Sequence, residues 1–231
     1  MNSGVPAPDK WLSFGLAFVG GFGDAAGFLL AKTFTGHITG SLVLGAITVA
    51  AQDWRGALAH FSAVAFFLAG IPLNVLIVRL TAAQPSWPLL RTVMGIEVIL
   101  IIAAYLALAY HLAGVEIFVV CQSLALGLQN AAFRRAGGIS VHTTYLTGLI
   151  TGLLAKEAER HAFHVTPPLS TVPDPKFGLL YGIWGSFVLG AVTGAAMVFH
   201  FKEPGILGAA LILFVIIIRS LTVASRADSA R

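Results

Sequence analysis

The chain has 231 residues, of which 57% are hydrophobic and 10% are charged, whereas an ordinary soluble domain carries about 25% charged residues. This composition excludes a soluble globular protein, and the abundance of large apolar residues excludes a disordered chain. The formal net charge is +4. Because the basic residues are scattered singly, they fit the loops of a membrane protein better than a nucleic-acid-binding surface.

Eight apolar runs follow one another along the chain. They cover residues 11–30, 38–51, 57–80, 89–112, 115–132, 141–155, 177–199 and 205–221. A helix needs about 20 residues to cross a bilayer core of about 30 Å, so the second and sixth runs look too short to cross. Both follow stretches rich in Gly and Thr, in which a continuous helix is weak and irregular backbone is expected.

The two short runs hold equivalent places in an internal duplication. The motif GFGDAA at Gly21 returns as GLQNAA at Gly127, and HITG at His37 is echoed by HTTYLTG at His142. Further along, FFLAG (66–70) resembles SFVLG (186–190). Order and spacing persist across four runs in each half, which predicts two repeats, at about residues 11–112 and 115–221, within a single transmembrane domain of residues 1–231.

The number of crossings decides the symmetry of these repeats. With eight spans the repeats are parallel (4+4), and basic residues are shared almost evenly between the two sides. With six crossings and two re-entrant or broken helices, the repeats are inverted (3+3), and nine basic residues lie on the side of the termini against two on the other. We therefore predict an all-α protein with six crossings, both termini cytoplasmic, and a cytoplasmic loop at 156–176.

The paired motifs GFGDAAGF with FTGHITGS, and GLQNAAFRRAGGISVHTTYLTG, resemble those of the YoaK-type family of bacterial integral membrane proteins. The resemblance extends from about Trp11 to Leu221. Where that family commonly has Thr-Gly-Asn, this chain has Thr39, Gly40 and Ser41. The resemblance implies a multi-pass fold in the bacterial inner membrane, and it implies no activity.

Two acidic residues lie within apolar runs, where a carboxylate costs about 2.5–3.5 kcal/mol on insertion scales. Asp24 lies deep in the first run, and its repeat mate is the neutral Asn130. Glu97 lies in the fourth run. Either acid is a candidate for coupling to protons or cations. The alternatives for Asp24 are a hydrogen bond between helices or a place near a helix end in the interface. For Glu97 they are an ion pair with an arginine or with His37, or a place in the interface.

The Gly/Thr-rich stretches supply the other candidate ligands of a polar solute or ion. His37 and His142 stand beside them in both halves and titrate near pH 6.5 when solvated. Hydroxyl, amide and glycine positions complete the predicted substrate or ion site: Thr39, Gly40, Ser41, Gln129, Asn130, Thr144, Thr147 and Gly148. The same residues would equally compensate for backbone hydrogen bonds lost at a helix break.

Arg134 and Arg135 follow the fifth run. They would attract an anionic group if their turn dips into the membrane, and would extend to the headgroups if it does not. No P-loop, dinucleotide-binding glycine motif, catalytic Ser/His/Asp order or metalloprotease HExxH is present in the sequence. The sequence therefore predicts no enzymatic activity, cofactor or metal, and no nucleic-acid partner.

The function expected from these features is a small-solute secondary transporter or permease, coupled to protons through Asp24. Its expected partners are membrane lipid and a small solute, and a homo-oligomer is left open. The alternatives are a channel, a non-transporting scaffold, or an intramembrane enzyme that uses His37 or His142.

Overall fold

The computed structural model describes residues 10–80, 87–111, 114–133, 135–136, 139–140, 151, 154–155, 158 and 175–229. These residues form seven helices, a 3-10 turn and a pair of two-residue strands. The helices are α1 (Lys10–Ala31), α2 (Ile38–Ala50), α3 (Trp54–Leu80), α4 (Trp87–Ala109), α5 (Gly114–Ala132), α7 (Pro175–Phe201) and α8 (Leu207–Ser229). The 3-10 turn η1 (Glu203–Ile206) joins α7 to α8, and β1 (Arg135–Ala136) pairs antiparallel with β2 (Ile139–Ser140).

Within the described part of the chain, six helices are long and apolar enough to cross a membrane, and α2 is a shorter apolar helix of 13 residues. The all-α, six-span prediction is therefore confirmed. So is the expectation that the second apolar run is too short to cross. The sixth run, at 141–155, lies almost wholly outside the described residues, as does most of the predicted loop at 156–176.

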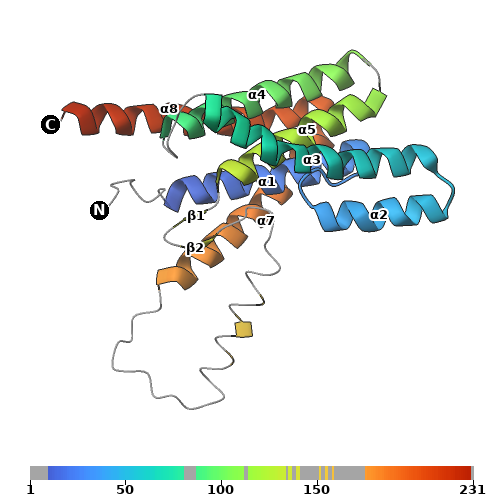
Figure 1. The fold of residues 1–231 in the computed structure, drawn as a ribbon, viewed down its shortest axis with the longest axis horizontal. Helices are drawn as coiled ribbons and strands as arrows, with labels where there is room; N and C mark the ends of the chain where they lie inside the picture. The colour runs from blue at the N-terminus through green and yellow to red at the C-terminus, as the bar shows by residue number, and fades with distance from the viewer. Residues whose placement is uncertain are drawn as a thin grey trace.

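The six long helices run in alternating directions, so that α1 begins and α8 ends at the same end of the bundle (Figure 1). We call this the terminal end. The turn between α2 and α3, the loop between α4 and α5, and η1 lie at the other end, which we call the opposite end.

Each half of the chain finds its closest packing partner in the other half. The most extensive helix contacts are α1 with α7 and α3 with α5. A Cβ at Gly21 of α1 would collide with the backbone carbonyl of Phe187, and a Cβ at Gly127 of α5 would collide with that of Phe67. Gly21 and Gly127 are matched in the sequence duplication, as are Phe67 and Phe187. The two interfaces are therefore built from the same small residues with their roles exchanged.

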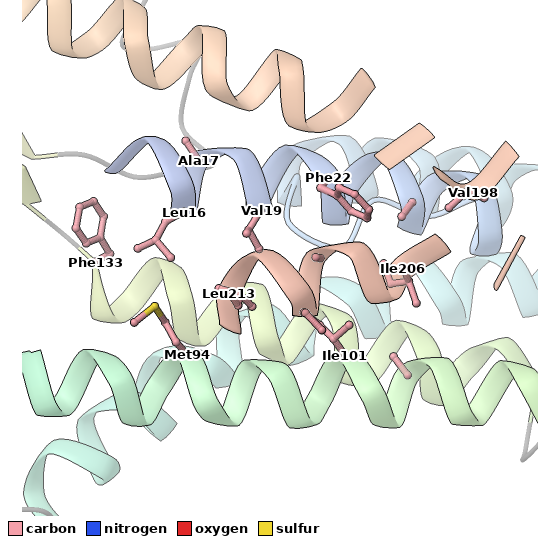
Figure 2. Close-up of a cluster of buried hydrophobic side chains, with 14 of the residues drawn as sticks. Leu16, Ala17, Val19, Phe22, Met94, Ile101, Phe133, Val198, Ile206 and Leu213 are labelled. Carbon is pink, nitrogen blue, oxygen red and sulfur yellow. The ribbon is translucent and has the colours of Figure 1, made fainter. Parts of the chain in front are cut away.

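The core is a cluster of buried apolar side chains where α1, α4, α5, α7 and α8 meet. Figure 2 shows Leu16 and Val19 of α1 facing Leu213 of α8, with Met94 and Ile101 of α4 pointing toward the same space. Ala residues and the glycines of α1 and α7 allow the backbones to approach closely, as in other membrane helix bundles.

Large apolar side chains also cover the outside of the bundle, for example Val43, Leu68, Ile99, Val192 and Leu211, each at least 49% exposed. A soluble monomer rarely exposes apolar patches of this extent. Lipid tails are the solvent that such a surface fits.

Charge is distributed unequally between the two ends. The terminal end carries one acidic residue, Asp228, and six basic residues, Lys10, Arg79, Arg91, Lys176, Arg219 and Arg226, among those described. At the opposite end, the basic residues Arg55 and Lys202 are accompanied by acidic residues. These acidic residues are Asp53, Glu116 and Glu203. The described charges therefore follow the distribution expected for six crossings.

Candidate functional site

The chain breaks between α1 and α2 at about half the depth of the bundle. From Lys10 to Asp24 the chain rises about 21 Å as helix, and the 13 residues of α2 add about 20 Å. The sum is close to the length of α3, which is about 40 Å for 27 residues. Contact between Gly45 and Phe61 shows that α2 returns along the first half of α3. The level at which Asp24 meets the α1–α2 loop is therefore near the middle of the bundle's length, which would correspond to the middle of a bilayer that the bundle spans.

The side chain of Asp24 binds the backbone of this loop. One carboxylate oxygen, Oδ1, accepts hydrogen bonds from the backbone N–H groups of Thr35 (3.0 Å), Gly36 (2.6 Å) and His37 (3.2 Å). The side chain is only 5% exposed. Because water is absent at this depth, such N–H groups need a protein acceptor. Asp24 thus supplies the hydrogen bonds that a continuous helix would have supplied.

The loop has further attachments on both sides. Thr33 Oγ1 forms a hydrogen bond with Nδ1 of His60 in α3 at 2.9 Å, and both side chains are buried. Thr35 Oγ1 donates to the Gly23 carbonyl of α1 at 3.4 Å. We call residues 32–37, together with Asp24 and His60, the α1–α2 joint. It ties α1, α2 and α3 together at one level.

The start of α2 divides the predicted ligands into two groups. Ser41 is buried and donates from Oγ to the Phe34 carbonyl at 2.6 Å. Gly40 packs against the rings of Phe34 and His37, and a Cβ there would lie 3.0 Å and 3.2 Å from them. Thr39, in contrast, is exposed on the outer side of α2. The structure therefore brings Asp24, His37, Gly40 and Ser41 together and leaves Thr39 outside.

Asp24 has one acceptor left. Its second oxygen, Oδ2, is buried and has no hydrogen-bond partner among the described residues. Among the described residues, the partners of Asp24 are in the α1–α2 loop and not in another helix, and Oδ2 leaves a position for a proton or a ligand as well.

Glu97 lies at the centre of α4 and is completely buried. Neither carboxyl oxygen has a hydrogen-bond partner in the part of the chain that the structure describes. An ion pair of Glu97 with an arginine or with His37 is therefore not present among the described side chains, which do not include those of Arg134 and Arg135. The His37 ring instead lies beside Phe34, with ring centroids 5.8 Å apart.

Sequence reasoning missed two polar residues at this level, His60 of the joint and Gln122 of α5. Gln122 is 1% exposed, and neither its amide oxygen nor its amide nitrogen has a partner among the described residues. Its Nε2 lies against Gly23, where a Cβ would come within 2.6 Å. The predicted site residue Gln129 lies seven residues, or about two helical turns, further along α5. Its Nε2 donates a hydrogen bond to the Leu16 carbonyl at 3.0 Å. The spacing of seven residues between two glutamines in an apolar run was the available signal.

The second half of the predicted site is described only in part. Asn130 lies in α5, is partly buried, and has a buried Oδ1 without a partner among the described residues. Arg135 is placed only by its backbone in β1. Several predicted residues lie outside the described residues, namely Arg134, His142, Thr144, Thr147 and Gly148.

Comparison with known proteins places the chain in a family. Residues 12–219 match the family described as "Protein of unknown function (DUF1275)". The chain belongs to this family. A curated relative, UPF0700 transmembrane protein YoaK of Bacillus subtilis (strain 168), is 28% identical over 142 residues, which cover 60% of this chain and 63% of the relative. The alignment thus spans less than two thirds of the relative's length, and no solved structure matches the chain.

The family match confirms the resemblance seen in the paired motifs, and the relative's name supports a multi-pass membrane protein. Neither name assigns an activity. The function has to be argued from the geometry of the buried polar groups.

Proposed function

We propose that this protein is a small-solute secondary transporter or permease that works by coupling solute movement to protons, with its polar site at the α1–α2 joint. The observation that supports this proposal is a helix break near mid-membrane whose loop is held by a buried carboxylate. Irregular backbone at membrane depth is tolerated where it is buried in protein or lines a cavity, and discontinuous helices form the substrate and ion sites of many transporters.

Asp24 is the proposed coupling residue. Protonation of the carboxylate would weaken its three hydrogen bonds to Thr35, Gly36 and His37, because an ionised acceptor binds N–H groups more strongly than a neutral one. Proton binding would thereby loosen the joint, and loosening would move the start of α2. In this scheme, Oδ2 is where a proton or a cationic group arrives.

We also propose that the two repeats are inverted, an arrangement that would support the same function. The exchanged contacts, Gly21 with Phe187 and Gly127 with Phe67, and the opposite directions of α1 and α5 fit a two-fold relation within the membrane plane. Transporters built this way expose a central site to alternate sides by moving one repeat against the other. We further propose that the terminal end faces the cytoplasm of a bacterial inner membrane, since it carries most of the described basic residues.

The test begins with ligand discovery. The purified protein is screened by thermal unfolding against amino acids, sugars, carboxylates, amines and inorganic ions, because a ligand of the folded state raises its melting temperature. A solute that does so is then added to proteoliposomes that contain a pH-sensitive dye. We expect addition of the solute to change the internal pH.

Asp24→Asn is the decisive variant because an asparagine oxygen can still accept the loop N–H groups but cannot exchange a proton. We expect it to fold and to retain the thermal response to the solute, while losing the internal pH change. A pH change equal to that of the original protein, or one seen equally in protein-free liposomes, would refute proton coupling through Asp24. If that happens, a channel, a scaffold or an intramembrane enzyme becomes the better account.

A further inference from the structure

Glu97 occupies an interior position that the α1–α2 joint does not use. Met94, Glu97, Ile101 and Ala104 are spaced three or four residues apart, so they share one face of α4, and all four are buried. Figure 2 shows Met94 and Ile101 pointing from α4 toward α1 and α8. Glu97 therefore lies between two residues of the apolar core, surrounded by groups that offer it no hydrogen bond.

Two glutamine side chains of α5 flank Glu97 along the bundle axis. Since α4 ends at Ala109 and α5 begins at Gly114, Glu97 is about 18 Å from the opposite end, whereas Gln122 and Gln129 are about 12 Å and 22 Å from it. Both glutamines face α1, at Gly23 and at Leu16 respectively. Each amide thus lies about one helical turn from the level of Glu97 along the bundle axis, on a helix that packs against α4.

We propose that Glu97, flanked by Gln122 and Gln129, is a proton-binding site in the interior of the bundle, separate from the α1–α2 joint. The bound proton forms an O–H bond on one Glu97 oxygen, and this O–H donates to an amide oxygen of a flanking glutamine. Release breaks that O–H bond and returns the proton to water. The inference does not depend on the transport activity proposed above, since it concerns only what Glu97 carries.

A proton suits this position better than other cations. A divalent metal needs several oxygen or nitrogen ligands, and no group of three or more His, Cys, Asp or Glu residues suited to a metal occurs among the described residues. An isolated carboxylate in a low-dielectric interior is far more costly than a neutral acid. The amide oxygens supply the acceptors that a neutral acid needs.

The charged groups of the surrounding helices do not change the assignment of Glu97 as a proton-binding residue. Helices α5 and α8, the turn η1 and helix α1 enclose this face of α4. Their described ionisable residues at the two ends of the bundle are Glu116, Glu203, Lys10, Arg219, Arg226 and Asp228. Between the two ends, the described ionisable residues of these helices are Cys121, which is partly buried, and Asp24, whose Oδ1 is occupied by the loop. No described Lys or Arg side chain lies at the depth of Glu97. The histidines of the α1–α2 joint have other contacts: His60 with Thr33, and His37 with Phe34.

Infrared spectroscopy of the purified protein near neutral pH tests the proposal directly, because a protonated carboxyl group has a C=O band separate from that of a carboxylate. We expect one such band, absent in Glu97→Gln and retained in Asp24→Asn. We expect Gln122→Leu or Gln129→Leu to shift it, since loss of a hydrogen bond changes the C=O stretch. Slow movement of the band after transfer to D₂O would report how readily the buried proton exchanges.

A spectrum that is unchanged by Glu97→Gln would overturn the proposal, because Glu97 would then be ionised. A carboxylate band that responds to Na⁺ and disappears in Glu97→Gln would overturn it in favour of a sodium site. A band that neither glutamine substitution moves would remove the amides from the site. If Glu97→Gln fails to fold, Glu97→Asp keeps the acid and must displace the band instead. None of these outcomes depends on whether the protein transports a solute.

Discussion

Two acids lie at about the same depth of this bundle, and the chain treats them in opposite ways. Asp24 accepts three backbone N–H groups through a single oxygen and thereby closes a helix break. Glu97 is buried in continuous helix, and neither of its oxygens has a partner in the described structure. An intramembrane acid is commonly taken as a sign of function. Here one acid anchors a loop through its hydrogen bonds, and the other makes no hydrogen bond to any described residue.

The comparison predicts that replacing the two acids by apolar residues changes the free energy of unfolding in opposite directions. Asp24→Ala removes the acceptor of three N–H groups at a depth without water, where an unpaired group costs several kcal/mol. We expect the free energy of unfolding to fall by about 4 kcal/mol, read as a lower melting temperature in detergent. Asp24→Asn is the matched control and should lose much less, because its oxygen remains an acceptor. Equal losses in the two variants would contradict the anchoring role.

Glu97→Leu should have the reverse effect. Replacing a buried polar group that lacks partners by an apolar one of similar size removes a desolvation penalty of about 1–3 kcal/mol. We expect the free energy of unfolding to rise by about 1 kcal/mol, because this penalty exceeds the contribution of about 0.5–1.5 kcal/mol from a single hydrogen bond between a protonated Glu97 and a glutamine amide. Ile101→Ala, one turn away on the same face, should be destabilising by about 2–5 kcal/mol through the cavity it leaves. A clear loss of stability in Glu97→Leu would show that Glu97 has a structural partner.

The hydrogen bond between Thr33 and His60 should contribute less to the stability of the α1–α2 joint than the three hydrogen bonds to Asp24. Thr33→Val keeps the shape of the side chain and removes the hydrogen bond to His60. Hydrogen bonds between membrane helices contribute about 0.6–2 kcal/mol, so we expect a loss of about 1 kcal/mol in thermal unfolding. If Thr33→Val were as damaging as Asp24→Ala, the joint would depend on α3 rather than on α1.

The smallest effect is expected on the outer side of α2. Thr39 is exposed and Ser41 is buried, although they lie two residues apart. Thr39→Val should leave the melting temperature unchanged, whereas Ser41→Ala should lower the free energy of unfolding by about 1 kcal/mol, because it removes the hydrogen bond from Oγ to the Phe34 carbonyl. Equal melting temperatures for the two variants would contradict the structural difference between these two positions.

Much of the fold could be predicted from the sequence, because segment length and hydropathy largely determine which helices cross a bilayer. The second run fails to cross because it has 13 helical residues. Asp24 stands out for a similarly simple reason, since a carboxylate in an apolar run requires an explanation. Its partners could not be read from the sequence, because they are backbone groups that return to it only after α1 has continued to Ala31 and the loop has folded back.

Two details of the site could not be predicted from the sequence, each for its own reason. Thr39 and Ser41 are similar in chemistry, and only the rotation of α2 against α3 decides which of them is buried. Gln122 has no counterpart in the sequence duplication, where the matched position in the first half is Leu16. A search for repeated polar residues therefore passes over it, although its burial without a partner makes it one of the most informative side chains in the bundle.

The exchanged glycine contacts also constrain the order in which the molecule can be assembled. During synthesis, α1 enters the membrane first, yet the helix against which Gly21 packs is not complete until Phe201 has been added. Throughout that interval, the small-residue face of α1 must be covered by lipid or by a chaperone. A ribosome that stops after the first half would release a fragment in which the Gly21 face of α1 and the Phe67 face of α3 lack their partner helices. Such a fragment would be a natural target for membrane quality-control proteases.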